Sequence, residues 1–221
     1  MGGRRAGLLD PCWPGIIAMD RTARASMKRC GWAKGTDMMI VYHDHEWGVP
    51  VHDDRRLFEH LMLDAFQAGL SWAIILDKRE NFRKAFASFD PEKIARYTRR
   101  DIGRLLANPG IVRNKQKVTA AVTNARAFLR IQERFGSFDA FVWQFVGGKP
   151  RHNSWKTMRQ LPAKTRESDR MSEGLKEQGF AFAGSTICYA FMQAAGMVND
   201  HLVSCFRHAE IRGLHTEPRP S

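Results

Sequence analysis

Two cysteine–histidine pairs, one near each end of the 221-residue chain, offer side chains of the types that bind zinc in proteins. Cys30 and His43 lie 13 positions apart, and His201 and Cys205 lie four apart, a spacing that places both on one face of a helical turn. Two thiolates and two imidazoles form a closed tetrahedral set, which is typical of structural zinc. The alternative is four unrelated residues, with Cys205 a small buried hydrophobe.

The stretch LLANPGIVRNKQKV, residues 105–118, has the features of a hairpin between two helices. Asn108 precedes Pro109, and proline disfavours helix at the residue before it, so the first helix ends there. Gly110 permits the positive φ angle of a tight turn. We therefore predict a helix-hairpin-helix unit at this place.

The second helix of this hairpin is expected to start near Arg113 or Asn114. Its first backbone N–H groups have no partner within the helix and carry the positive end of the helix dipole, so they favour a phosphate. Lys115 and Lys117 add positive charge at the same point. A clamp of this kind binds the DNA backbone irrespective of sequence. The alternative is an ordinary turn between helices with a basic rim.

Helical signals recur along the chain and strand signals are weak, so we predict an all-α fold of about eight to ten helices. Residues 147–164, rich in Gly, Pro, Lys and Arg, are expected to form a loop. The predicted helix N-caps are Ser71, Asp90, Thr98 (with Asp101 in a capping box), Ser137 and Ser168. The predicted helix stops are Gly69, Gly179 and Gly196.

Positive charge belongs to the body of the chain. The net charge is +12, of which residues 1–28 contribute +3 and residues 209–221 contribute none, so +9 falls on residues 29–208. A basic body suggests a polyanionic partner, most often nucleic acid. The alternative is a solvated basic surface without a partner.

The chain carries no apolar run of 18 residues, so we expect no membrane span. Its four scattered cysteines indicate reduced thiols and a cytoplasmic setting. We interpret residues 1–27 as a tail or a misplaced start, residues 28–208 as one domain, and residues 209–221 as a C-terminal tail.

Long blocks of the sequence resemble bacterial 3-methyladenine DNA glycosylase I. They are RCGWAKGTDMMIVYHDHEWGVPVHDDRRLFEHL, QAGLSWAIILDKRENFRKAFASFDPEKIA, GIVRNKQKVTAAVTNARAF and GFAFAGSTICYAFMQAAGMVNDHLVSC, and they span residues 28–205. The resemblance implies an all-α helix-hairpin-helix glycosylase fold. It also implies one structural zinc whose ligands, Cys30, His43, His201 and Cys205, join the N- and C-terminal segments.

The same resemblance implies a pocket for a damaged base. The stacking tryptophan of the family falls on Trp72, its pocket tyrosine on Tyr42, and two further aromatics on Trp32 and Trp47. A flipped base is held between aromatic faces, and electron-rich rings attract the cationic N3-methyladenine. The alternative for some of these tryptophans is packing in the core.

Two positions depart from the family pattern. Asp64 stands where the family usually has a pocket glutamate, and Met39 stands where better-known members have a tyrosine. The Asp64 carboxylate would accept hydrogen bonds from the amino edge of the adenine, but it sits back by roughly 1.5 Å because it is one methylene shorter. The alternative for Asp64 is a surface or capping carboxylate.

The resemblance implies a base-excision glycosylase that acts as a monomer on double-stranded DNA containing alkylated bases. We also expect Gly69 and Leu70, in QAGLSW, to contact the DNA. The two departures leave the preferred lesion open. They also leave open a non-catalytic DNA- or damage-binding protein on the same scaffold.

Overall fold

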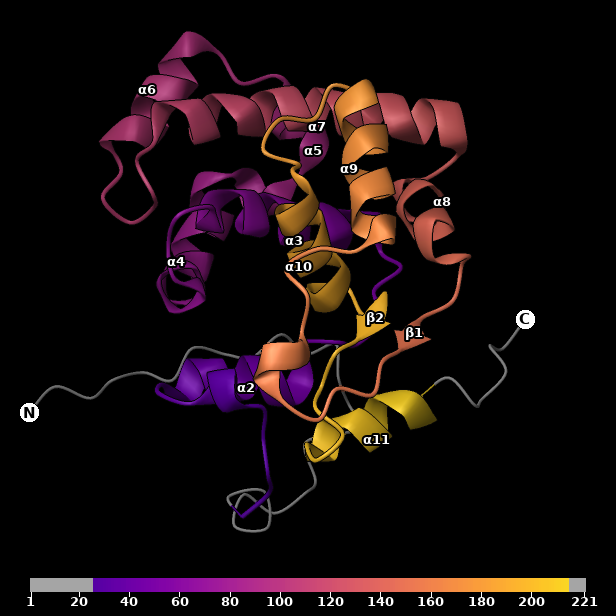
Figure 1. The fold of residues 1–221 in the computed structure, drawn as a ribbon. Helices are drawn as coiled ribbons and strands as arrows, with labels where there is room; N and C mark the ends of the chain where they lie inside the picture. The colour runs from indigo at the N-terminus through magenta and orange to yellow at the C-terminus, as the bar shows by residue number, and fades with distance from the viewer. Residues whose placement is uncertain (1–25, 215–221) are drawn as a thin grey trace, which may run out of the picture.

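The computed structural model describes residues 26–214, and this part of the chain is mostly helical (Figure 1). The α-helices are α2 (Asp37–His45), α3 (Asp54–Gln67), α4 (Trp72–Ala85), α5 (Pro91–Ala95), α6 (Arg99–Ala107), α7 (Lys115–Phe135), α8 (Phe138–Trp143), α9 (Arg166–Glu177), α10 (Ser185–Ala194) and α11 (Phe206–Gly213). The 3-10 turns are η1 (Gly31–Ala33), η2 (Ala87–Phe89), η3 (Gln144–Val146) and η4 (Met158–Gln160), and the strands are β1 (Arg151–His152) and β2 (Val198–Asn199).

Three of the predicted helix starts are confirmed by side-chain hydrogen bonds. Asp90 accepts from the backbone N–H of Lys93 at the start of α5. Thr98 and Asp101 form a full capping box at α6. Ser137 caps α8. These short polar side chains satisfy backbone N–H groups that have no partner within the helix.

Two other predicted caps differ from the structure. Thr165, and not Ser168, is the N-cap of α9, and Ser168 occupies the third helical position, where it completes a capping box. Ser71 does occupy the N-cap position of α4, but its side chain makes no capping hydrogen bond. Ser168 therefore stabilises the start of the predicted helix, but it does so from within the first turn and not as the N-cap.

The main hydrophobic core lies between α3, α7 and α10. The long helix α7 runs along one side of the molecule, α5 and α6 pack against it, and α3 and α10 lie next to each other in the centre (Figure 1). The predicted loop 147–164 contains β1, which pairs with β2 in parallel over two residues. None of the helices in residues 26–214 is both long and apolar enough to cross a membrane.

A second, smaller core lies between α2, the first turn of α4, and the chain before α11. Its buried or half-buried members are Cys30, Trp32, Met39, Tyr42, Trp47, Trp72, Leu76, Trp155, Leu161, Ala194, Leu202, Cys205 and Phe206. In Figure 1, α2 and α11 lie together below the larger helical body. Helix α11 continues to Gly213, five residues beyond the expected domain end at 208.

Gly196 follows α10 where the chain leading from α2 to α3 crosses it. Its φ is +69°, and a Cβ at this position would lie 2.3 Å from the carbonyl carbon of Val49. Gly136, after α7, has a similar φ of +85° but open space around it. An alanine would therefore be strained at either position, but only at Gly196 would its Cβ also clash with neighbouring backbone.

We expect Gly196→Ala to lower the free energy of unfolding by about 3 kcal/mol or more, because both strain and overpacking act there. Gly136→Ala, the matched control, should cost only the about 1–2 kcal/mol of a left-handed alanine. Urea unfolding of both variants measures the difference. Equal losses in the two variants would show that the close approach of Gly196 to Val49 does not contribute to the cost of the substitution.

Candidate functional site

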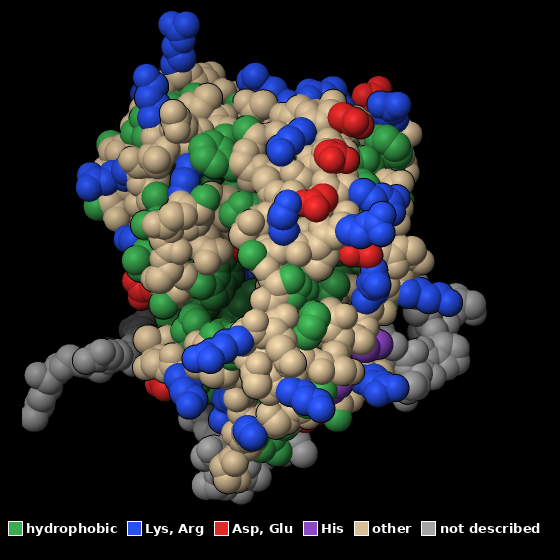
Figure 2. Space-filling view, in the orientation of Figure 1, with side chains coloured by type: hydrophobic (Ala, Val, Ile, Leu, Met, Phe, Trp, Pro, Cys, Tyr) green, Lys and Arg blue, Asp and Glu red, His purple; other side chains and the backbone are tan. Residues whose placement is uncertain are grey.

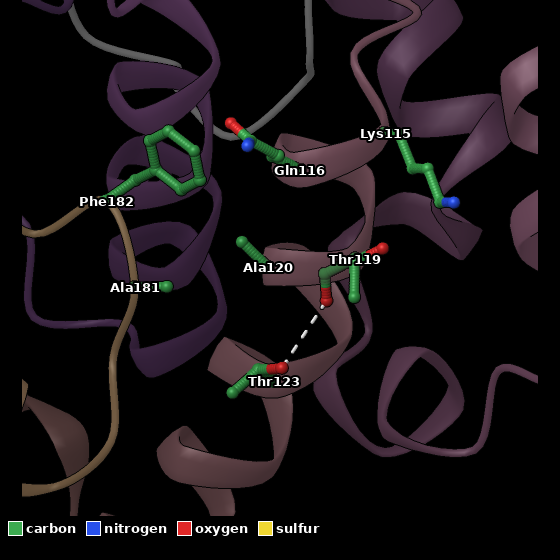
Figure 3. Close-up of a pocket in the computed structure, with 7 residues that line it drawn as sticks. All are labelled: Lys115, Gln116, Thr119, Ala120, Thr123, Ala181 and Phe182. Atoms are coloured by element: carbon green, nitrogen blue, oxygen red, sulfur yellow. Dashed lines mark hydrogen bonds between the residues drawn. The ribbon is translucent and has the colours of Figure 1, made fainter.

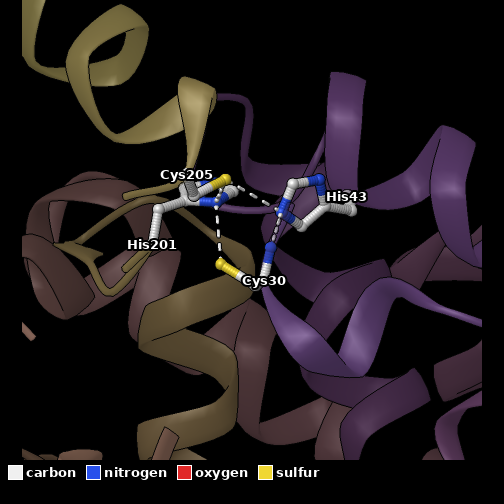
Figure 4. Close-up of side chains that lie close together, drawn as sticks. All are labelled: Cys30, His43, His201 and Cys205. Atoms are coloured by element: carbon white, nitrogen blue, oxygen red, sulfur yellow. Dashed lines mark hydrogen bonds between the residues drawn. The ribbon is translucent and has the colours of Figure 1, made fainter. Parts of the chain in front are cut away.

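The structure brings together the four predicted metal ligands, although they come from opposite ends of the chain (Figure 4). Cys30 and His43 come from the segment around α2, and His201 and Cys205 from the turn before α11. All four are buried, and their ligand atoms lie within 4.8 Å of one another. His201 and Cys205 meet across an irregular turn, so the helical turn expected from their spacing is not formed.

The distances within this cluster fit a tetrahedral metal site. Cys205 Sγ lies 3.4 Å from His43 Nε2 and 3.6 Å from His201 Nδ1, and Cys30 Sγ lies 3.6 Å from His201 Nδ1. A tetrahedral ion with Zn–S of about 2.3 Å and Zn–N of about 2.0–2.1 Å has S···N edges of about 3.5 Å. The cluster could therefore hold a metal ion as a closed four-ligand site.

Outer contacts fix both histidine rings. His43 Nδ1 lies 2.8 Å from Asp44 Oδ1, and Arg29 binds the same carboxylate at 2.7 Å. His201 Nε2 lies 2.9 Å from the Trp47 carbonyl oxygen, which can only accept a hydrogen bond. Each histidine thus turns its other nitrogen toward the cysteines, as metal-ligating histidines do. Burial alone would lower the pKa of His43, but hydrogen bonds to Asp44 and Cys205 outweigh it and raise that pKa.

The four predicted pocket aromatics lie close together, but they divide into two groups. Tyr42 and Trp72 have ring centroids 5.3 Å apart. Trp47 packs instead on His201, with centroids 4.6 Å apart, and Trp32 lies against Trp47 at 4.9 Å. Trp47 and Trp32 therefore cover the metal-ligand cluster, and Trp32 also reaches Tyr42 at 6.3 Å. Tyr42 lies near Asp64, and Trp72 packs against Tyr42.

Asp64 is 3% exposed, so it is not the surface carboxylate of the alternative interpretation. Within the described part of the chain, Asp64 Oδ2 and Trp72 Nε1 are both buried and find no hydrogen-bond partner. Burial raises the pKa of the Asp64 carboxyl well above its ordinary value. Burial, and then the nearby Asp64, also raise the pKa of Tyr42. Asp64 and Trp72 thus each bring a polar atom without a partner to the neighbourhood of Tyr42, and a bound polar ligand could satisfy such atoms.

Each of these three residues stands on a different helix: Tyr42 on α2, Asp64 on α3 and Trp72 on α4. A chain of ion pairs joins the three helices. Arg79 of α4 binds Glu46, just after α2, at 2.6 Å and Glu59 of α3 at 2.7 Å. Arg83 adds a bond to Glu59 at 2.9 Å. The ion pairs therefore hold the relative placement of Tyr42, Asp64 and Trp72.

Sequence reasoning did not identify several residues of this region. His60, one helical turn before Asp64, is 2% exposed, and burial followed by the charge of Arg79 lowers its pKa to about 4. Trp155 lies within the predicted loop and packs into the smaller core. Its indole donates to Asp200, which also accepts from Tyr189. The spacing of four residues between His60 and Asp64 could have indicated that both side chains lie on the same face of α3.

A hollow opens on the face drawn in Figure 2, and its floor is hydrophobic. It lies between α4 and α10 and above α2 in the orientation of Figure 1. Two of these elements carry Trp72 and Tyr42.

The predicted hairpin is present between α6 and α7, but its glycine has a different role from the one expected. Gly110 does not have a positive φ. A Cβ there would instead lie 3.2 Å from Cβ of Asn81 on α4 and 3.0 Å from Oδ1 of Asn108. Lys78, also on α4, donates to the carbonyl oxygen of Pro109 at 3.2 Å. Gly110 therefore permits a close contact between the hairpin and α4.

The start of α7 combines exposed and buried basic side chains. Asn114 is the N-cap and accepts from the backbone N–H of Lys117 at 3.1 Å. Arg113 and Lys115 are exposed. Lys117, which we expected to bind phosphate, turns inward and donates to the carbonyl oxygens of Phe66 and Ala68. It is therefore not available to DNA.

Gly69 and Leu70 lie in the short connection between α3 and α4. Gly69 has a φ of +79°, and Leu70 is 38% exposed. A separate surface cavity of about 370 Å³ runs along the first turns of α7 (Figure 3), and its lining includes Lys115 and Phe182. None of the predicted pocket residues Tyr42, Asp64 and Trp72 lines it.

Proteins of one family are similar to this chain over most of its length. The family model described as methyladenine glycosylase matches residues 32–208. DNA-3-methyladenine glycosylase 1 of Escherichia coli (strain K12) is 47% identical over 179 residues, covering 81% of this chain and 96% of that protein. DNA-3-methyladenine glycosylase of Haemophilus influenzae is 46% identical over 177 residues, covering 80% and 96%.

Solved structures show the same similarity. A crystal structure of 3-methyladenine DNA glycosylase I has a TM-score of 0.80 at 47% identity, covering 81% of this chain and 98% of that one. A variant of 3-methyladenine DNA glycosylase I in complex with 3-methyladenine has a TM-score of 0.79 at 37% identity, covering 81% and 97%. The match to one family extends over nearly all of the described residues. The chain therefore belongs to the methyladenine glycosylase family.

Proposed function

We propose that this protein is a base-excision DNA glycosylase that flips N3-methyladenine out of double-stranded DNA and releases it by hydrolysis. The observation that carries the proposal is the pair of buried, unpartnered polar atoms, Asp64 Oδ2 and Trp72 Nε1, beside the Tyr42 ring. A buried polar atom without a partner costs about 1–3 kcal/mol, so a fold retains it where a ligand uses it.

The Asp64 carboxylate recognises the base by charge and hydrogen bonding. Its unpartnered oxygen accepts from the amino edge of the adenine, and the negative charge favours the cationic form of the base. Trp72 and Tyr42 supply electron-rich rings on which the flipped base stacks. Because an aspartate is shorter than a glutamate, the base must sit deeper to reach it. An unmethylated adenine is neutral and gains less from the same carboxylate.

The chemistry needs little help from an acid or base. N3-methyladenine is positively charged, so its glycosidic bond breaks with the electron pair leaving on the base, which becomes neutral. Water adds to the sugar carbon and gives up a proton to solvent. The protein contributes by holding the flipped base and by stabilising the oxocarbenium-like sugar electrostatically.

Cys30, His43, His201 and Cys205 would hold zinc in a structural role, because a closed four-ligand site has no position for substrate. The ion would supply a fixed crosslink between the chain ends. DNA phosphate binds at the N-terminus of α7, where Arg113, Asn114 and Lys115 are exposed, and Pro109, Gly110, Gly69 and Leu70 lie in neighbouring connections. The protein acts as a monomer in the cytoplasm.

We expect Asp64→Asn to slow the release of 3-methyladenine by roughly 10- to 150-fold. A hydrogen bond to a charged group contributes about 1.5–3 kcal/mol, and about 1.36 kcal/mol corresponds to tenfold in rate. Trp72→Ala should cost at least as much, because it removes the stacking ring. Single-turnover assays on methylated DNA measure both. Release by Asp64→Asn at the parent rate would remove Asp64 from the chemistry, and a parent protein that releases no base would favour a non-catalytic damage-binding protein.

The raised pKa of Asp64 gives this test a pH dependence. Catalysis needs the ionised carboxylate, so kcat/KM should rise as pH increases through the pKa of Asp64, and Asp64→Asn should lose that rise. Stability should change in the opposite direction. The folded state prefers the protonated carboxyl, so its contribution is present at low pH and is lost as pH rises through the raised pKa. Asp64→Asn should therefore be the more stable protein at alkaline pH.

For the metal, we expect about one zinc per chain in the parent protein and none in Cys205→Ala. Loss of a structural zinc removes up to about 10–16 kcal/mol of binding energy in small domains, so this variant should melt early or be partly folded. Cys188→Ala is the matched control, because Cys188 is equally buried but donates only to the Ala183 carbonyl oxygen. Elemental analysis that finds no zinc in freshly purified parent protein would overturn the assignment.

If the start of α7 holds a phosphate, Lys115→Ala should weaken binding to all DNA sequences alike. The slope of log affinity against log salt should fall by about 1, the value for one lost phosphate contact. Binding titrations on undamaged duplexes at several salt concentrations measure this slope. An unchanged slope and affinity would leave the hairpin with a purely structural role.

A further inference from the structure

The buried ammonium of Lys117 joins the DNA-binding hairpin to the helix that carries Asp64. Lys117 is the third residue of α7, and it is 8% exposed. Its Nζ donates to the carbonyl oxygen of Phe66 at 2.9 Å and to that of Ala68 at 2.5 Å. Both acceptors are backbone carbonyl oxygens, so the ammonium group lies against two peptide dipoles.

These two carbonyl groups lie where α3 ends. The last carbonyl groups of a helix have no partner within it and carry the negative end of the helix dipole. An ammonium ion is the complementary group for this place. Ala68 is the C-cap of α3, and Gly69, with its positive φ, follows directly. Lys117 therefore fixes the turn that connects α3 to α4.

The same turn sets the distance between the two pocket groups that lack partners. Asp64 is four residues before Ala68 on one side, and Trp72 is the first residue of α4 on the other. A rotation about the connection would displace the carboxyl of Asp64 relative to the indole of Trp72. Pocket geometry in this enzyme class tolerates little displacement, because a misplacement of about 1 Å can cost roughly 100-fold in rate.

A second lysine ties the hairpin to α4 itself. Lys78 donates to the carbonyl oxygen of Pro109, and Gly110 approaches Asn81 closely. The hairpin thus contacts the end of α3 through Lys117 and the middle of α4 through Lys78. The hairpin that would bind the DNA backbone therefore contacts both α3, which carries Asp64, and α4, which carries Trp72.

We propose that Lys117 is a positioning residue, which makes the alignment of Asp64 and Trp72 depend on the seating of the hairpin on DNA. This inference rests on the proposed function. Lys117 does not contact the DNA or the base. It acts by holding the α3–α4 turn, and a substitution there should change the rate of base release without changing the number of phosphate contacts.

The test compares Lys117→Met with Lys115→Met, two equal truncations two positions apart. Single-turnover release of 3-methyladenine is measured against enzyme concentration, at a temperature well below the melting point of each variant. Lys117→Met should lower the maximal rate about tenfold, which corresponds to about 1.4 kcal/mol, and should keep the salt slope of the parent. In Lys115→Met the loss should appear as a higher half-saturating concentration and a smaller salt slope.

Each other outcome overturns a part of the proposal. A parent-like maximal rate in folded Lys117→Met would show that Lys117 only stabilises the fold. A salt slope reduced by about 1 would show that Lys117 reaches a phosphate. If Lys117→Met does not fold, Lys117→Gln, which keeps one donor, takes its place, and a parent-like rate there has the same meaning. Failure of the proposed function is recognised separately, because the parent protein would then release no base.

Discussion

The contact between the two ends of the described chain is the constraint on which the pocket depends. Cys30 and His43 meet His201 and Cys205 in a buried cluster, and the smaller core is built around it. This core has few large buried side chains compared with the one between α3, α7 and α10. Helix α2 is held against the larger body through this contact, and α2 carries Tyr42. A crosslink by metal would therefore stabilise the pocket wall as well as the chain ends.

Asp64 differs from the other carboxylates of its region in having no ion pair. Asp64 is buried with one oxygen unpartnered, although an ion-paired carboxylate would be more stable in the same place. Nearby, Glu46, Glu59, Arg79 and Arg83 satisfy one another through short ion pairs. The paired network keeps the three helices in register. Under the proposed function, the carboxyl of Asp64 is instead left for the base, so that stability and recognition fall to separate carboxylates.

The basic residues of the hairpin have separate tasks, which the sequence does not distinguish. Lys115 is exposed and Lys117 is buried against the end of α3, although both belong to one short basic run. Lys78 of α4 donates a hydrogen bond to the carbonyl oxygen of Pro109 in the turn of the hairpin. Under the proposed function, a hairpin that binds DNA and also contacts α3 and α4 would connect backbone binding with base recognition. This connection consists of direct hydrogen bonds to helix ends.

The sequence by itself determined the helical character, several helix starts, the family, and the four residues of the buried Cys and His cluster. These features depend on local periodicity, on capping residues such as Asp90 and Thr98, or on residue types that have few other uses together. Only the tertiary structure decided that Trp47 covers the cluster, that Gly110 serves a close contact with Asn81, and that Lys117 points inward. These roles depend on which helix lies opposite a residue, and local propensity along the chain carries no information about a neighbour that is distant in sequence.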